Sequence, residues 1–454
     1  MRPAPTKSVR SQAAAAASGH STRRQPLEPN RRRRARATTL KGLLEDLAQR
    51  PQLALLAGYL LLAPFYVLRS GLPQPADLLM VVLIALTAFS PGYRFPRGSR
   101  GPRRALFLFI LYVCAVNILW VLVTGNFSFG KKNTMLIYPV FYLYNGLVFA
   151  ALVALYHCFR ERLLASTIHL VAASVILQAV LATRFLSATT FRQELFFNNP
   201  NQLGYYVLLS ATIVVIGSKY LKVNVWYQAI FFLGAIYLAM LSLSNAALIS
   251  LGVLIVVAFS RRFVVLVTTL VLLFGAFQFS NVGPKLVDNV ALRLGRIGTG
   301  KDDNLAGRGY DRIAHHPTYL ILGAGEGGLD RVESQFEGEL HSTVGTLLFS
   351  YGVAGTFLFF SFLFSLIGRR PTIYLYVAPV FLYGLTHQGL RFTHFWILWA
   401  FILCLLIEAK GRAPRLPRPN FHFGRRKPIA PPGSARSHPG TLRHRPEGAV
   451  LPHS

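Results

Sequence analysis

Cysteine is scarce in this chain, and its few cysteines exclude two kinds of site. Only Cys114, Cys158 and Cys404 occur among 454 residues, and each lies inside an apolar run. Their spacing matches neither a zinc site nor a disulfide framework. The sequence therefore predicts no structural disulfide, and the cysteines do not indicate a compartment.

Charged residues are also few, and those of negative sign are the fewest. Charged side chains make up 14% of the chain and hydrophobic ones 53%, with 17 Asp and Glu against 48 Lys and Arg. Apolar runs of about 18 to 25 residues recur, and each is about long enough to cross a bilayer. One soluble core does not accommodate such runs, so the sequence predicts an all-α, polytopic integral membrane protein.

The formal charge of +31 lies mostly in the two ends of the chain and in short loops. This distribution follows the cytoplasmic positive bias of membrane proteins, so it does not indicate nucleic acid. Residues 1–50 hold twelve Lys and Arg, and residues 409–454 hold ten. We expect both to be disordered cytoplasmic tails that fix topology and contact anionic lipids. Residues 51–408 are then the membrane domain.

About twelve spans are expected between the tails, at 53–69, 76–90, 105–124, 135–157, 163–183, 203–218, 224–241, 246–260, 263–280, 343–367, 373–390 and 394–408. If both termini are cytoplasmic, every basic loop falls on the cytoplasmic side: 91–104, 159–162, 219–222, 261–262 and 369–370. The opposite side receives one long loop, 281–342, which holds nine of the seventeen acidic residues. A loop of this length commonly has a function.

Polar residues gather in the predicted extracytoplasmic loops. Residues 184–204 carry Arg184, Arg192 and the sequence NNPNQ, in which Asn201 is either a ligand-binding residue or part of a turn and helix cap. The long loop carries Arg308 and Arg312 among its acids. Its glycine-rich LGAGEGG lacks the lysine and the strand–helix context of a phosphate-binding loop, so we expect backbone turns.

His341 opens the tenth predicted span, directly after the long loop. Taken alone, a histidine at a helix start is most simply an interfacial polar residue in contact with water. The last external turn adds His387, Arg391 and His394, which either join the same site or anchor the chain at the interface. The acidic residues before His341, namely Glu333, Glu337 and Glu339, have no assigned role.

Arginine and histidine on one face suit a particular chemistry. Arginine binds phosphate oxygens through paired, charge-assisted hydrogen bonds, and histidine accepts a proton from a hydroxyl near neutral pH. No metal-binding pattern occurs on this face, since adjacent His315 and His316 are poorly placed to chelate one ion. The pattern favours transfer from a phosphate-activated donor to a hydroxyl, with arginine charge stabilising the leaving group. No cofactor is predicted.

Three segments follow one another within residues 190–360: FRQELFFNNPNQLGYY, AGRGYDRIAHHPTYLILGAGEGG and ELHSTVGTLLFSYGVAG. Their order and spacing resemble the O-antigen ligase and polymerase superfamily of bacterial envelope glycan synthesis. The resemblance implies a GT-C-like fold with a large periplasmic loop in the inner membrane. It also implies metal-independent, inverting transfer from glycans linked to undecaprenyl pyrophosphate.

Carried over by position, the resemblance implies that Arg192 and Arg308 face the pyrophosphate and that His341 activates the acceptor. Asn201, Arg312, Arg184 and Arg391 are further candidates for substrate binding. The chain departs from the family where Ser342 replaces a common asparagine and where no tryptophan follows Arg308. The first departure affects the expected acceptor geometry, and the second leaves Arg312 as an alternative to Arg308.

The sequence leaves three functions open. The first is a polysaccharide polymerase (Wzy-type), which joins lipid-linked repeat units at the periplasmic face. The second is an O-antigen ligase (WaaL-type), which transfers a finished glycan to lipid A-core or to a protein. The third is a secondary transporter, which the nearly charge-free spans disfavour because carriers place ionisable groups near the bilayer midplane.

Overall fold

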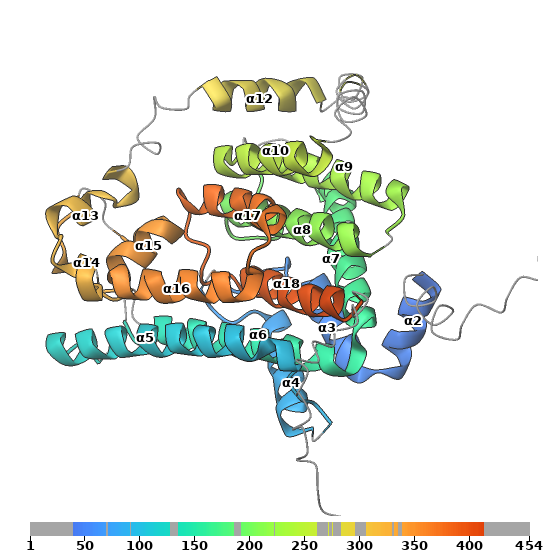
Figure 1. The fold of residues 1–454 in the computed structure, drawn as a ribbon. Coiled ribbons are helices and arrows are strands. Elements are labelled where there is room, and N and C mark those ends of the chain that lie inside the picture. Colours follow the sequence, from blue (N-terminus) through green and yellow to red (C-terminus); the bar gives the residue numbers. More distant parts are fainter. Residues whose placement is uncertain are drawn as a thin grey trace, which may run out of the picture. The chain divides into compact units, whose positions relative to one another are not determined.

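All regular structure in the described part of the chain is helical. The computed structural model describes residues 40–69, 71–90, 92–127, 135–185, 192–221, 223–260, 271, 275, 283–295, 306–328, 331–334 and 338–412. The helices, which Figure 1 labels where there is room, are α2 Leu40–Gln49, α3 Pro51–Leu62, α4 Pro75–Phe89, η1 Arg97–Ser99, α5 Arg100–Thr124, α6 Ile137–Phe159, α7 Glu161–Phe185, α8 Pro200–Tyr220, α9 Val225–Ser242, α10 Asn245–Phe259, α12 Gly283–Gly295, η4 Ala306–Arg308, α13 Asp311–His315, α14 Tyr319–Leu322, α15 Thr343–Ser350, α16 Gly352–Ile367, α17 Pro371–Gly384 and α18 Thr393–Arg412.

The predicted class, a helical membrane protein, is confirmed. Among the described residues, six helices are long and apolar enough to cross a membrane: α5, α6, α7, α8, α9 and α18. The apolar helices α3, α4, α10, α16 and α17 are shorter. Most of the predicted span 263–280 and of both tails lies outside the described residues. The number of twelve spans and the GT-C-like architecture therefore stay predictions.

The chain divides into two compact units, Met1–Arg412 and Ala413–Ser454. The second unit lies wholly outside the described residues. The helices and the site below all belong to the first unit.

The helix starts follow local sequence. Helices α3, α4, α8 and α17 each begin with proline, whose fixed φ and missing N–H suit the first helical position. At α8 the side chain of Asn199 accepts a hydrogen bond from the Asn201 backbone N–H at 2.8 Å. The asparagine–proline run thus turns the chain and caps the helix, which was one of its two predicted roles.

Helices α8 and α18 form the core of the unit. Helix α8 packs against α7, α9, α10, α17 and α18, and α18 packs against α6 as well (Figure 1). Along α18 the side chains of Trp396 and Trp399 are fully buried. Helix α5 pairs with α16, which also packs against α18. Helices α8 and α18 carry apolar side chains on nearly all sides, as expected for helices at the centre of a bundle.

The tenth predicted span, 343–367, is divided into two helices rather than one. Helix α15 ends at Ser350 and α16 begins at Gly352, whose φ of +64° is left-handed. A side chain at Gly352 would meet the carbonyl oxygen of Ile321 at 2.6 Å, so a neighbouring segment also requires glycine there. The break between α15 and α16 thus depends on a contact with a distant segment, and the apolar pattern of the sequence did not predict it.

The loops sort into two groups, each held together by its own contacts. We call one group the polar end: residues 65–74, 192–202, 241–245, the described part of 306–342, and 385–392. Backbone hydrogen bonds join Tyr66 to Phe196, Gln193 to Leu241, and Thr343 to His387. These are the loops that the sequence places on the extracytoplasmic side.

We call the other group the basic end: residues 92–99, 159–162, 219–224, 258–260 and 368–370. Its contacts include the Cys158 thiol donating to the carbonyl of Gly92 at 3.6 Å and Lys219 donating to the carbonyl of Ala258 at 3.2 Å. These contacts join loops that the predicted alternation of spans places on the same side.

Candidate active site at the polar end

The segment that carries His341 is tied to two others. The backbone N–H of His341 donates to the carbonyl of Arg308 at 3.1 Å. The Arg308 guanidinium in turn donates to the carbonyl of Thr386, in the turn between α17 and α18. Two of the three predicted catalytic residues are therefore adjacent, although more than thirty positions separate them in the chain.

Ser342, next to the predicted base, fixes the backbone there. Its buried hydroxyl caps α15 by accepting from the Gly345 N–H at 2.9 Å, donates to the Gly384 carbonyl at 3.0 Å, and lies 2.6 Å from the Tyr310 hydroxyl. The imidazole of His341 itself is exposed. The serine that departs from the family pattern thus has a structural role, while the histidine ring remains accessible from solvent.

Arg192, the third predicted catalytic residue, reaches the same turn through two intermediaries. Its guanidinium donates to Asn201 Oδ1 at 2.9 Å and to the carbonyl of Ser242 at 3.3 Å. The carbonyl of Asn201 accepts from the Tyr383 hydroxyl at 2.8 Å. The ring of Tyr383 stacks on His387, with centroids 4.7 Å apart. Asn201, predicted to bind substrate, thus connects Arg192 to the α17–α18 turn.

The electrostatics of His387 show that the predicted catalytic residues share one region. Burial lowers the pKa of His387 to about 3, and the charges of Arg308, His341 and Arg192 contribute in the same direction. The Thr386 hydroxyl lies 2.9 Å from His387 Nδ1. A neutral imidazole close to two guanidinium groups marks a place that favours an anion.

The pKa of His341 is lowered as well. Desolvation by its neighbours lowers this pKa below 6.5, and Arg308, Arg391 and Arg312 lower it further. Glu339 acts in the opposite direction. The imidazole is therefore neutral at pH values near 7, the state in which it accepts a proton from a hydroxyl.

The remaining predicted binding residues lie at different depths. Arg312 is 2% exposed and lies behind Gly309, where an added side chain would meet Arg312 Nη1 at 2.9 Å. Arg184 is exposed in the last turn of α7. Among the described residues, no hydrogen bond joins the Arg184 side chain to the other predicted site residues. Arg308, whose guanidinium reaches the α17–α18 turn, is better placed than Arg312 to meet a ligand.

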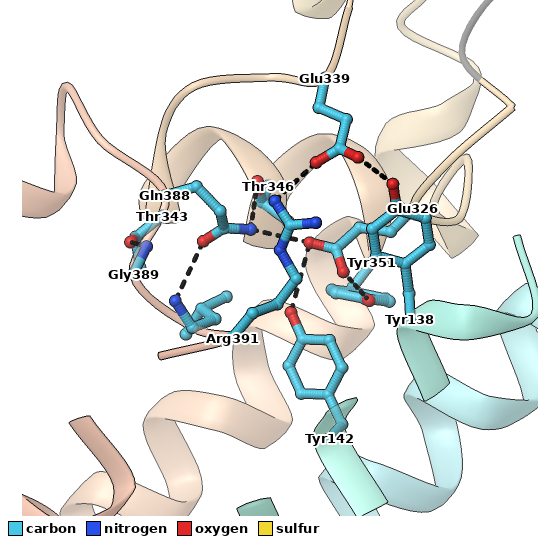
Figure 2. Close-up of polar contacts among 11 residues, drawn as sticks. Tyr138, Tyr142, Glu326, Glu339, Thr343, Thr346, Tyr351, Gln388, Gly389 and Arg391 are labelled. Carbon is cyan, nitrogen blue, oxygen red and sulfur yellow. Dashed lines mark hydrogen bonds and ion pairs between the residues drawn. The ribbon is translucent and has the colours of Figure 1, made fainter. Parts of the chain in front are cut away.

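Arg391 lies beside the cluster and pairs with an acid. Its guanidinium contacts the Glu339 carboxylate at 2.5 Å, and the other oxygen of Glu339 accepts a hydrogen bond from the Tyr138 hydroxyl (Figure 2). Glu339 thus joins the His341 segment to α6 and to the α17–α18 turn. One of the three acidic residues that the sequence left unassigned has a structural place.

A buried carboxylate lies on the other side of Arg391, and the sequence did not single it out. Glu326 is 5% exposed; it accepts hydrogen bonds from Gln388 at 2.7 Å, Tyr351 at 3.0 Å and Tyr142 at 3.4 Å (Figure 2). Burial raises the pKa of Glu326, and the charge of Arg391 and these hydrogen bonds oppose that shift.

The glycine-rich segment explains how this carboxylate is placed. Gly323, Gly325, Gly327 and Gly328 all have positive φ, which confirms the predicted backbone turns. The Glu326 backbone N–H donates to Asn117 Oδ1 at 2.8 Å, so the turn is held against α5. A single acid flanked by glycines within the long loop is the sequence feature that could have pointed to this residue.

No group of three His, Cys, Asp or Glu side chains within the described ranges is arranged to hold a metal ion. We therefore assign no metal ligands. Comparison with known proteins returned no family model, no curated protein and no solved structure that matches this chain. The geometry of the polar end is thus what bears on function.

Proposed function

We propose that the protein is a polysaccharide polymerase that joins repeat units linked to undecaprenyl pyrophosphate, at the periplasmic face of a bacterial inner membrane. The observation that carries the proposal is that His341, Arg308 and, through Asn201 and Tyr383, Arg192 are all linked to the one turn between α17 and α18. Two guanidinium groups and a histidine within one region match the needs of glycosyl transfer from a pyrophosphate donor.

The proposed reaction assigns one role to each kind of residue. The neutral imidazole of His341 takes the proton of the acceptor hydroxyl, whose oxygen then attacks the anomeric carbon of the donor sugar. The bond between that carbon and the pyrophosphate oxygen breaks, and its electron pair leaves with the pyrophosphate. Arg192 and Arg308 stabilise the negative charge that develops there. Attack opposite to the leaving group inverts the anomeric centre.

The position of the site supports a lipid-linked donor. The loops of the polar end adjoin the ends of apolar helices. A lipid tail therefore remains in the bilayer while its head group reaches His341. The exposed imidazole suits an acceptor that arrives from water. Asn201, which accepts a hydrogen bond from Arg192, orients one of the two proposed phosphate-binding side chains.

The test is the profile of lipid-linked glycans in a deletion strain that is complemented with variants. Without the protein, single lipid-linked repeat units accumulate, and the wild-type chain restores polymer. His341→Ala, Arg192→Ala and Arg308→Ala fail to restore it, each with a loss on the order of 10²–10³ in rate. Immunoblots of membranes confirm equal abundance of the variants.

Glu194→Gln is the matched control, because this exposed acid lies in the same loop as Arg192 and, among the described residues, no hydrogen bond joins its side chain to the cluster. It restores polymer as the wild type does. Full-length chains that remain on the carrier lipid in the deletion strain would replace the polymerase assignment with a ligase. Wild-type polymer from the His341→Ala strain would remove the histidine from the mechanism.

A further inference from the structure

Glu339 is the acid most closely associated with the proposed base. It lies two positions before His341. Its negative charge raises the pKa of His341 and so favours the charged form of the imidazole. Its carboxylate has two firm contacts, the Arg391 guanidinium at 2.5 Å and the Tyr138 hydroxyl (Figure 2). The chain just before the histidine is therefore attached to two separate elements.

Arg391 in turn is held between two carboxylates. The partly exposed Glu339 contacts the guanidinium, and the buried Glu326 lies beside it (Figure 2). Gln388, which precedes Arg391 in the same turn, donates to Glu326 at 2.7 Å. The ion pair thus attaches Glu339 to the turn between α17 and α18, which Gln388 in turn holds against Glu326.

We propose that Glu339 is the positioning residue of His341: clamped by Arg391 and Tyr138, it fixes the segment that carries the imidazole and supplies the negative charge that faces it. The catalytic half of this inference rests on the proposed function. The electrostatic half does not, because it concerns the protonation of His341 in the resting protein.

The charge around His341 makes this role specific. The groups that face the imidazole from the packed elements are Arg308 of η4, Arg312 of α13, and His387 and Arg391 of the α17–α18 turn. The three arginines oppose protonation of His341, His387 is neutral near pH 7, and Glu339 opposes the effect of the arginines. Without Glu339, the imidazole becomes a weaker base, so it takes a proton from an acceptor hydroxyl less readily.

The test measures the protonation of His341 directly, through its rate of carbethoxylation by diethyl pyrocarbonate as a function of pH. The full-length protein in detergent is labelled, and the His341 peptide is quantified by mass spectrometry. Only the neutral imidazole reacts, so the midpoint of the rate profile reports its pKa. We expect the midpoint of Glu339→Gln to lie at lower pH than that of the wild type.

Two further variants separate position from charge. Tyr138→Phe removes one contact of Glu339 and no charge, so it leaves the midpoint unchanged and slows glycan transfer by about tenfold or more. Glu333→Gln changes an exposed acid of the same loop and alters neither the midpoint nor the transfer rate.

An unchanged midpoint in Glu339→Gln would overturn the electrostatic role, and wild-type transfer by Tyr138→Phe would overturn the positioning role. If the wild-type protein transfers no glycan, the proposed function fails while the labelling result still stands. If Glu339→Gln does not fold, the outcome with Tyr138→Phe decides the positioning role.

Discussion

At the scale of single residues, the two glutamates beside Arg391 differ in their contact with water. Glu339 is partly exposed and pairs directly with the guanidinium, whereas Glu326 is buried among hydroxyl and amide donors. A buried carboxylate without sufficient compensation binds a proton more tightly than an exposed one. The protonation of Glu326 is thus linked to folding.

We predict that Glu326 makes the stability of the protein depend on pH. Burial raises the pKa of this carboxyl above its ordinary 4.5, so the folded state binds the proton more tightly than the unfolded chain. The folded state therefore loses stability as the pH rises above 4.5 toward the raised pKa. Glu326→Gln removes this titration, so its melting temperature falls less than that of the wild type over the same range, by a few degrees.

The measurement is the intrinsic tryptophan fluorescence of detergent-solubilised protein during heating, between about pH 5 and about pH 8. Glu194→Gln, a change at an exposed acid, follows the wild-type curve. Parallel curves for Glu326→Gln and the wild type would show that this carboxyl does not titrate differently in the folded protein.

At the scale of elements, the glycine-rich segment and the break between α15 and α16 depend on each other. The backbone N–H groups of Ala324 and Gly325 donate to the carbonyls of Phe349 and Ser350, each at 2.8 Å. These are carbonyls at the end of α15, where the helix supplies no partners of its own. The loop thus completes the hydrogen bonding that the interrupted helix leaves open.

We predict that Gly323→Ala disrupts this contact. A Cβ at Gly323 would lie 2.3 Å from the Ser350 carbonyl oxygen and 2.6 Å from Tyr351 Cα, and φ there is +98°. The backbone conformation alone costs about 1–3 kcal/mol for a residue with a side chain, and the clash adds to it. Membrane abundance and melting temperature both fall.

Gly101→Ala is the control for this substitution. Gly101 lies in α5 with no atom within 4 Å of an added Cβ. Alanine stabilises an exposed helical position by about 1 kcal/mol relative to glycine, so this variant is unchanged or more stable. An equal fall in melting temperature in both variants would mean that the replacement of any glycine, rather than the loss of the contact with α15, lowers stability.

The sequence predicted different parts of the site unequally well. Apolar run length and basic loops identified the helices and placed Arg192, Arg308 and His341 on one face, because both patterns are local. The partners of Glu339 and Glu326 come from α6 and from the α17–α18 turn, far away in the chain. Such contacts depend on how helices pack, which periodicity does not encode. For the same reason the break at Gly352 was missed.

At the scale of the whole molecule, the polar end and the basic end differ in the charged residues that they carry. Arginine, histidine and acidic residues with fixed partners gather at the polar end. Lys219, Arg160 and the arginines of 94–104 lie at the basic end, where positive charge favours the cytoplasmic side. The proposed reaction requires that the polar end face the periplasm, because the donor glycan is presented there.

We predict that thiols at the two ends react from opposite sides of the membrane. Cys158 is exposed at the basic end, and Glu333→Cys adds a thiol at an exposed position of the polar end. A membrane-impermeant maleimide labels Glu333→Cys in right-side-out vesicles, whereas Cys158 reacts only in inside-out vesicles. Cys404 is buried and serves as the internal control, reacting only after denaturation. Labelling of Cys158 from the outside would reverse the topology, and it would separate His341 from the compartment in which its proposed donor is presented.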